Sequence, residues 1–250
     1  EYGLDISITT NGVLFDKEKA ERCLHHLSWI RFSLDAGIGE SYSKIHGTRK
    51  EDFDKVISNI KEAVKIRNEK GLKTTIGVQF LLISENINEA VRAVKLVKET
   101  GADNIQIKPY SHHPSSKNNY SVDYSKLEWI EEELKKLEDE KFQVQFRKQT
   151  MKRIEEGRDY RECYGLPFFA LIDARGNVIP CNLFYNTPEF TYGNLNEKSF
   201  SEIWESEQRK KIIEKIKQRG IDVCRKGCRL DPVNNYLFRL KNPHPHDNFI

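Results

Sequence analysis

The sequence predicts an α/β protein in which residues 1–150 form a parallel β-sheet with helices between its strands. The first observation behind this prediction is that short apolar, β-branched segments alternate with longer segments of helical periodicity. The second is the length of the connecting segments, which suits right-handed crossovers between parallel strands. The third is a change of pattern after Met151, where short strand and helix signals accompany four cysteines. Residues 151–250 are therefore expected to form a smaller α+β domain.

The elements of the first domain follow in chain order. A strand over 4–9 is closed by the turn Thr10-Asn11-Gly12, and Asp16 can cap a helix that runs to about residue 27. A second strand over 29–35 is followed by a Gly-containing loop. The remaining elements are helices over 53–64, 87–99 and 126–140, strands over 74–83, 104–109 and 142–146, and a polar loop over 111–122.

Polar residues gather where these strands end. Functional groups in parallel α/β folds lie at the carboxyl ends of the strands, and three of the four ends read here are polar. This pattern is the one that a binding site needs. Asn11 and Gly12 could equally turn the chain, and Asp35 could cap a loop. The four ends are Thr9-Thr10-Asn11-Gly12, Ser33-Leu34-Asp35, Leu81-Leu82-Ile83 and Lys108-Pro109-Tyr110.

The second domain is expected to contain a β-hairpin over 168–180 with its turn at Arg175-Gly176. An amphipathic helix over 200–216 and a further helix over 232–240 follow. These segments contain too few apolar strands for a large core. A metal centre that links the hairpin to the tail would supply the missing constraint.

Cys23 is interpreted as a small buried hydrophobe. The other four cysteines suit such a centre, namely Cys163, Cys181, Cys224 and Cys228. They could bind one zinc ion, ligate one [4Fe–4S] cluster, or be coincidental core residues. Zinc ribbons usually present two Cys-x2-Cys knuckles, and Cys163 and Cys181 do not form one, although they could flank a hairpin whose ends lie close. The residue types alone leave zinc and cluster equally open.

Composition excludes several classes of partner. The 41 basic and 38 acidic residues are well mixed, with a net charge of +3 and no long basic tract, so no nucleic-acid partner is expected. No apolar run approaches the roughly 18 residues of a membrane span, and no signal peptide is visible. We expect a cytoplasmic protein without disulfides.

The cysteine region resembles the C-terminal SPASM or "twitch" domain of the radical S-adenosylmethionine (SAM) superfamily. Because the region has only four cysteines, it is similar to the shorter form with one auxiliary [4Fe–4S] cluster, which implies that all four are ligands. The matching motifs are Cys163-x12-Gly176-x4-Cys181, Val178-Ile179-Pro180-Cys181, Gly193-Asn194-Leu195, Ile203-Trp204 and Cys224-x3-Cys228.

The first domain is similar to the later part of the partial (β/α)6 TIM-like barrel of that superfamily. Thr9-Thr10-Asn11-Gly12 resembles the end of its third strand, Phe32-Ser33-Leu34-Asp35 its fourth, and Glu40 to Gly47 the turn that follows. The resemblance implies that SAM is contacted by Thr10, Asn11, Ser33, Asp35 and Lys108.

The resemblance also has a gap, because the family's Cys-x3-Cys-x2-Cys loop and its "GGE" segment are absent. The chain opens at Glu1 without an initiator Met, so we expect that an N-terminal part of the parent is missing and that this chain does not cleave SAM. The intact parent would bind SAM and a second [4Fe–4S] cluster. It would generate a 5′-deoxyadenosyl radical and abstract hydrogen from a sugar or cyclitol, nucleotide or peptide.

An electron donor such as flavodoxin or ferredoxin is implied for the parent. With four thiolate ligands the auxiliary cluster has no open iron, which favours electron transfer or bracing over direct binding of substrate. No general base is identified. A further set of residues could bind an anionic or sugar-like substrate or be ordinary surface residues, namely His112, His113, Lys117, Arg147 and the tail His244-Pro245-His246. The alternatives are a zinc-stabilised protein- or RNA-binding module without redox chemistry and an α/β enzyme without metal redox chemistry.

Overall fold

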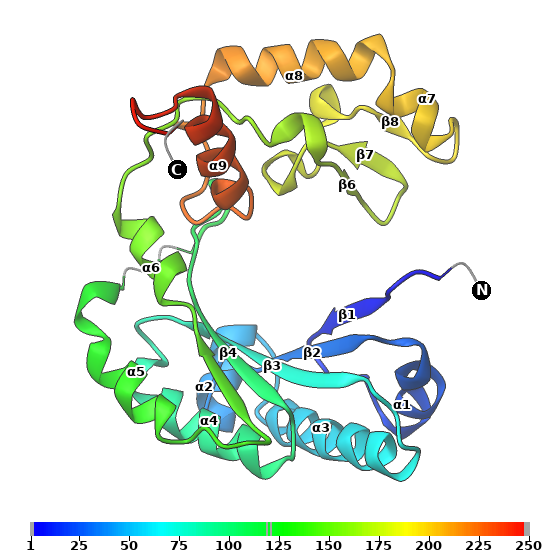
Figure 1. Ribbon diagram of the computed structural model, residues 1–250. Coiled ribbons are helices and arrows are strands. Elements are labelled where there is room, and N and C mark those ends of the chain that lie inside the picture. The colour runs from blue at the N-terminus through cyan, green and yellow to red at the C-terminus, as the bar shows by residue number, and fades with distance from the viewer. Residues whose placement is uncertain (1–2, 119, 121, 248–250) are drawn as a thin grey trace. The chain divides into compact units, whose positions relative to one another are not determined.

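The computed structural model describes residues 3–118, 120 and 122–247 (Figure 1). The chain divides into two compact units, of which the first comprises residues 1–110 and 120–155 and the second residues 111–119 and 156–250. Segment 111–119 thus groups with the second unit, although the sequence analysis placed it in the first domain. Glu1, on which the expectation of a missing N-terminal part depends, lies outside the described residues. Within the described ranges, no helix is long and apolar enough to cross a membrane.

The first unit contains a five-stranded sheet in the spatial order β1-β2-β3-β4-β5, and every pair of neighbours is parallel. The predicted α/β class with a parallel sheet is therefore confirmed. Because spatial order equals chain order, each crossover returns to the next position along the sheet. The strands are β1 (Ser7–Thr10), β2 (Trp29–Ser33), β3 (Thr75–Leu82), β4 (Asn104–Pro109) and β5 (Gln143–Phe146).

Helices cover one face of this sheet, where they bury alternate strand residues such as Ile30, Val78 and Ile105 (Figure 1). Asp16 caps the first helix as predicted, since its carboxylate accepts a 3.1 Å hydrogen bond from the Lys19 backbone N–H. The helices are α1 (Lys17–Cys23), α2 (Gly39–His46), α3 (Glu51–Glu69), α4 (Ala90–Glu99), α5 (Glu128–Lys135) and α6 (Lys148–Glu155).

Helix α2 corrects the sequence analysis, which expected only a Gly-containing loop after the second strand. Its eight residues contain only two large apolar side chains, Tyr42 and Ile45, together with two serines and a glycine, so the sequence gives little helical signal. Tertiary packing stabilises this helix where its intrinsic propensity is low, because Tyr42 is 1% exposed in the core. Gly47 ends the helix with a left-handed backbone at φ 63°. The expected helix over 126–140 is also shorter, ending at Lys135.

The second unit contains an antiparallel three-stranded sheet in the order β6-β7-β8. The expected hairpin is present, and Gly176 turns it with φ 83°. The single helix expected over 200–216 is broken in two, because Ser206 caps a new helix by accepting a hydrogen bond from the Arg209 backbone N–H at 3.2 Å. The elements are β6 (Leu171–Ile172), β7 (Asn177–Ile179), β8 (Gly193–Asn194), α7 (Phe200–Trp204), α8 (Glu207–Arg219) and α9 (Asp231–Lys241).

The turn after β1 is fixed to the core at Gly12. This residue has φ 78°, and a Cβ atom there would lie 2.6 Å from Cδ1 of Phe32. The carbonyl oxygen of Gly12 accepts a 2.7 Å hydrogen bond from Asn59 Nδ2. Glycine is therefore required here for two reasons, the left-handed backbone and the close approach of an aromatic ring.

We predict that Gly12→Ala lowers the free energy of unfolding by about 3 kcal/mol, the sum of left-handed strain and overpacking against Phe32. Gly47→Ala is the matched control, because Gly47 has φ 63° but nothing within 4 Å of the added Cβ. The control should cost only the backbone strain, about 1–2 kcal/mol. Urea denaturation of both variants measures the difference, and equal losses would contradict the packing account.

Candidate functional site

The four clustered cysteines come from three segments of the second unit. Cys163 precedes a 3-10 turn over Leu166–Phe168. Cys181 lies two residues after the end of β7, and Cys224 and Cys228 lie in the loop before α9. All four thiols are free and partly buried. The structure therefore collects residues that are up to 65 positions apart in sequence (228 − 163 = 65) into one unit.

The four thiols form one electrostatically connected group, because every pairing among them contributes to their pKa shifts. Burial raises the pKa of the Cys181 thiol to about 12 and that of Cys224 to about 11, and charge on the other cysteines adds to both shifts. Four thiolates gathered in a partly buried site are unfavourable unless cations accompany them. Binding of metal ions to deprotonated cysteines meets that condition.

Hydrogen-bond donors point at these sulfur atoms. The Leu230 backbone N–H donates to Cys228 Sγ at 3.5 Å, and the Leu183 N–H donates to the sulfur of Cys181. The side chain of Asn234 and the backbone N–H groups of residues 165 and 166 lower the pKa of Cys163, in opposition to burial. Such N–H to sulfur bonds stabilise thiolates and tune iron–sulfur clusters.

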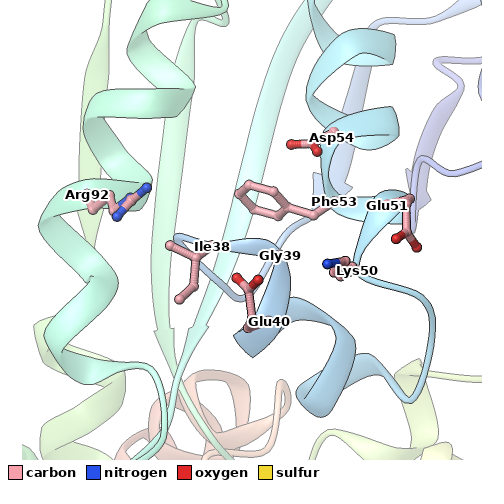
Figure 2. Close-up of a pocket in the computed structure, with 8 residues that line it drawn as sticks. All are labelled: Ile38, Gly39, Glu40, Lys50, Glu51, Phe53, Asp54 and Arg92. Carbon is pink, nitrogen blue, oxygen red and sulfur yellow. The ribbon is translucent and has the colours of Figure 1, made fainter.

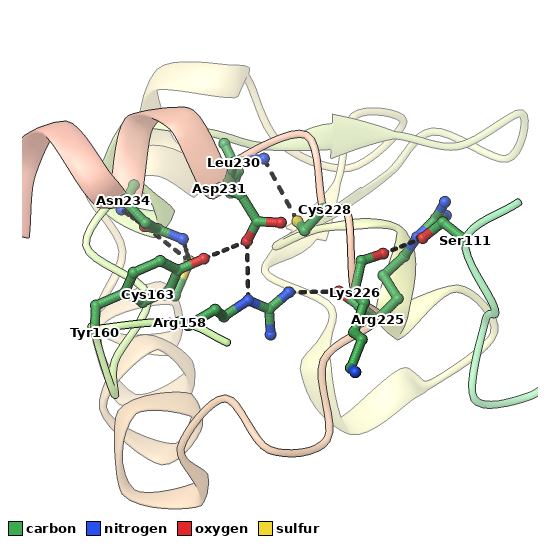
Figure 3. A network of polar contacts seen from close by, with 11 residues as sticks. Ser111, Arg158, Tyr160, Cys163, Arg225, Lys226, Cys228, Leu230, Asp231 and Asn234 are labelled. Atoms are coloured by element: carbon green, nitrogen blue, oxygen red, sulfur yellow. Dashed lines mark hydrogen bonds and ion pairs between the residues drawn. The ribbon is translucent and has the colours of Figure 1, made fainter. Parts of the chain in front are cut away.

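A buried polar network on α9 holds the cysteine segments in place (Figure 3). Asn234, 3% exposed, accepts a 2.7 Å hydrogen bond from Gly165 N at Oδ1, which orients its Nδ2 toward Cys163 Sγ at 3.6 Å. Asp231, also 3% exposed, accepts hydrogen bonds from Arg158 Nε at 3.1 Å and from the Tyr160 hydroxyl. One turn of α9 thus fixes the segment around Cys163.

Arg158 extends the network to the last cysteine pair. Its Nη2 donates to the Arg225 carbonyl at 2.6 Å, between Cys224 and Cys228 (Figure 3). Its positive charge lowers the pKa of both those thiols, in opposition to burial. A cation at this position offsets part of the negative charge of bound thiolates.

Segment 111–118 packs on the same cysteine segments. Arg225 Nε donates to Ser111 Oγ at 2.9 Å, and the Ser111 hydroxyl bonds to the Lys226 carbonyl. His113 Nε2 lies 3.1 Å from the Asn182 carbonyl, next to Cys181. His113 therefore serves the local structure of this unit in these contacts.

The residues present fit an auxiliary cluster by the chemistry of their donors, because four thiols are the ligand set that a [4Fe–4S] cluster uses, one for each iron. Four thiolates are also a ligand set for one zinc ion, so the donors alone leave both metal centres open. Among the described residues, no group of three His, Cys, Asp or Glu side chains is placed to hold one metal ion. The buried Tyr192 hydroxyl, which has no hydrogen-bond partner among the described residues, lies near the same group.

A second polar surface lies on the sheet of the first unit, on the face opposite the buried strand residues. In register, Ser33 of β2 pairs with Gln79 of β3, and Gln106 of β4 pairs with both Gln79 and Gln145 of β5. Gln106 Nε2 donates to Gln145 Oε1 at 2.7 Å, whereas the buried Gln106 Oε1 has no partner within the described ranges. The buried Nε of Arg31, on the same face, has none there either. Such atoms need polar partners from outside the chain, which water or a bound polar ligand supplies.

Three residues predicted to contact SAM lie at the carboxyl edge of this face. Lys108 Nζ donates to Gln79 Oε1 at 2.7 Å, and Gln79 is the register partner of Ser33. Asp35 is buried, with 8% of the residue exposed, and its carboxylate accepts a 2.5 Å hydrogen bond from Leu81 N. The charge of Lys108 acts on the same carboxylate. Burial raises the pKa of Asp35, against the opposing effects of that N–H, His46 and Lys108.

Thr10 is the last residue of β1 and pairs with Phe32 of β2, and Asn11 follows it. Both residues use their side chains in the turn. Thr10 Oγ1 accepts from Gly12 N at 3.0 Å, and Asn11 Oδ1 accepts from Val13 N at 3.2 Å. These bonds match the alternative in which Asn11 and Gly12 turn the chain. The sequence analysis did not single out Gln79 and Gln106, although each is a polar residue inside an apolar strand, a period-2 signal that marks one face.

A pocket elsewhere in the first unit lies between α2, the start of α3 and α4 (Figure 2). Its charged residues have both signs, and its lining contains none of the residues predicted to contact SAM. It therefore receives no functional assignment. The lining residues are Ile38, Gly39, Glu40, Lys50, Glu51, Phe53, Asp54 and Arg92.

Comparisons with known proteins agree with this geometry. The family model "SPASM: Iron-sulfur cluster-binding domain" matches residues 163–229, the span that contains all four cysteines. A "Cysteine-type anaerobic sulfatase-maturating enzyme" of Clostridium novyi is 25% identical over 92% of this chain and 65% of its own length. A "Probable GTP 3',8-cyclase" of Methanocaldococcus jannaschii is 29% identical over 61% of this chain and 48% of its own length. The chain thus spans about half to just under two thirds of these relatives.

The fold is also similar to that of solved structures. SuiB of Streptococcus suis bound to S-adenosylmethionine superimposes with a TM-score of 0.60 at 16% identity, over 83% of this chain and 49% of SuiB. SuiB has also been solved with the precursor peptide SuiA. At this identity, the likeness concerns the fold.

We predict that Asp231→Asn destabilises the second unit by about 3 kcal/mol, because the Arg158 guanidinium loses the charge that partners it in a mostly buried site. The exposed Asp222→Asn is the control and should change stability by less than about 0.5 kcal/mol. Hydrogen exchange of the α9 amides measures the local free energy of opening. Equal protection in the two variants would contradict a role for this ion pair.

Proposed function

We propose that this chain takes part in the radical modification of a peptide, because it belongs to the radical SAM superfamily and carries a C-terminal SPASM domain. The cofactors of that superfamily are SAM and [4Fe–4S] clusters. The observation that supports this most is the group of four connected, partly buried thiols within the SPASM span. We propose that Cys163, Cys181, Cys224 and Cys228 ligate one auxiliary [4Fe–4S] cluster in a twitch-type domain.

The role of the auxiliary cluster follows from its ligands. Four thiolates occupy one iron each, so no iron is left open for substrate. Electron transfer or bracing of the domain is therefore favoured over direct ligation of substrate. Arg158 and the backbone N–H groups at the sulfurs would hold the charged site in either role.

The five-stranded sheet is proposed to be the later part of a partial (β/α)6 barrel, and its polar face to bind SAM and substrate. When bound with a reduced cluster, SAM supplies a radical that abstracts hydrogen from a substrate. Gln79 would orient polar groups of these ligands together with Lys108, to which it is bonded. Asp35 and Ser33 lie at the same edge, beside Leu81 and Gln79. Thr10 and Asn11 would contribute through the turn that their side chains stabilise.

A peptide substrate is favoured over a nucleotide by the extent of the likeness. The match to the sulfatase-maturating enzyme extends over 92% of the chain, while the match to the cyclase covers 61%. SuiB, whose fold resembles this one, has been solved with a precursor peptide. An electron donor such as flavodoxin or ferredoxin belongs to the same proposal.

Anaerobically purified protein should be brown, with about four irons and four sulfides per chain. Alanine substitution of any one of the four proposed ligands should lower bound iron to below about one per chain, because a cluster with a missing ligand is labile. Cys23→Ala is the control and should keep its iron, since Cys23 packs against the core of the first unit. Colourless protein with one zinc per chain would support the rival zinc-stabilised module instead.

We further predict that these 250 residues alone do not cleave SAM. Their five cysteines include no Cys-x3-Cys-x2-Cys arrangement, which the family uses for the cluster that reduces SAM. Reduction with dithionite in the presence of SAM should give no 5′-deoxyadenosine by mass spectrometry, while added 5′-deoxyadenosine is recovered. Formation of 5′-deoxyadenosine above the protein-free control would contradict this prediction.

A further inference from the structure

Tyr192 occupies a defined position in the core of the second unit. It directly precedes β8, and its backbone N–H donates to the Val178 carbonyl of β7 at 2.8 Å. Its side chain is 3% exposed and belongs to the apolar cluster that also contains Phe184. Cys163 and Cys181 pack against that cluster. Tyr192 is thus part of the apolar cluster against which Cys163 and Cys181, two of the proposed ligands, pack.

The hydroxyl group of Tyr192 lacks a hydrogen-bond partner among the described residues. Its oxygen atom is buried. A buried hydroxyl without a partner is unfavourable, and phenylalanine would fill the same core space without that cost. An orphaned tyrosine hydroxyl therefore indicates a polar partner other than this chain's own side chains.

Two observations indicate where that partner lies. Cys163 and Cys181 pack against the apolar cluster that contains Tyr192, and their charge raises the pKa of its phenol. The guanidinium carbon of Arg209 lies 5.8 Å from the centre of the Tyr192 ring. Arg209 is fixed in turn by a 2.7 Å bond from Nη2 to the Pro167 carbonyl and by stacking over Trp204 at 3.7 Å.

This environment makes Tyr192 a hydrogen-bond donor. Burial raises the pKa of its phenol, and charge on the two cysteines adds to that rise, while Arg209 opposes it. An ordinary phenol, with a pKa of about 10, is already protonated at neutral pH, so the Tyr192 hydroxyl carries a proton to donate. A protonated hydroxyl next to sulfur ligands can donate to a sulfur atom, which is an acceptor only.

We propose that the Tyr192 hydroxyl donates a hydrogen bond to a sulfur atom of the auxiliary cluster and raises its reduction potential. This inference rests on the proposed function, because it requires the cluster. Reduction adds negative charge to the cluster, so a hydrogen bond to sulfur is stronger in the reduced state and favours it. Tyr192 is thereby a redox-tuning residue that contacts the cofactor. It differs from the backbone N–H donors because a side-chain substitution removes its hydrogen bond and leaves theirs in place.

The test is Tyr192→Phe in the complete chain with its cluster assembled anaerobically. A potentiometric titration followed by electron paramagnetic resonance gives the fraction of reduced cluster at each potential. At the midpoint potential of the unchanged protein, the ratio of reduced to oxidised cluster should fall on the order of tenfold, a shift of about 59 mV for one electron. Tyr236→Phe, which removes the hydroxyl of a 64% exposed tyrosine in the same unit, is the control and should not move the ratio.

A second variant keeps the proposal testable if Tyr192→Phe does not load iron. Replacement of Tyr192 by 3-fluorotyrosine strengthens the donor and should move the potential in the opposite direction, upward. Unchanged potentials in loaded Tyr192→Phe, or in the fluorotyrosine protein, would overturn the proposal. Failure of the unchanged protein to bind iron would instead refute the auxiliary cluster itself, so the two failures are distinguishable.

Discussion

Buried thiols can ionise together only when cations accompany them, and the second unit depends on this constraint. The four cysteines interact with one another, and burial raises the pKa of Cys181 to about 12. Without cations the group is stable as neutral thiols. Asn234 and Asp231 then still hold the segment around Cys163 to α9, and Arg158 holds it to the loop before α9. Metal binding would convert the same residues into a covalently linked centre.

The two units use their polar groups differently. In the second unit, backbone N–H groups and Asn234 point at sulfur atoms, so the polar groups serve the proposed cluster. In the first unit, a row of glutamines crosses the sheet, and the Gln106 Oε1 atom lacks a partner in the part of the chain that the structure describes. The first arrangement suits a resident cofactor, and the second suits ligands that enter and leave.

Sequence patterns predicted the sheet because each strand is a short apolar run bounded by clear stop signals, as for β4 (Asn104–Pro109), whose bounds match the expected ones. Helix α2 was missed because its stability comes from burying Tyr42 and from the glycine that ends it, neither of which is periodic. The break between α7 and α8 was missed because Ser206 forms a cap inside an otherwise helical pattern.

Cysteine spacing identified the four candidate ligands, but their partners depend on tertiary contacts. Asn234 is 71 residues from Cys163, and Tyr192 precedes a strand of two residues, so no local pattern connects either to the centre.

The central claim is that the four cysteines hold one iron–sulfur cluster. Native mass spectrometry of the anaerobically purified chain tests it most directly, because it weighs the protein together with whatever is bound. The account predicts one added mass of four irons and four sulfides with the loss of the cysteine protons. An added mass of a single zinc ion, or none after anaerobic assembly with iron and sulfide, would contradict it.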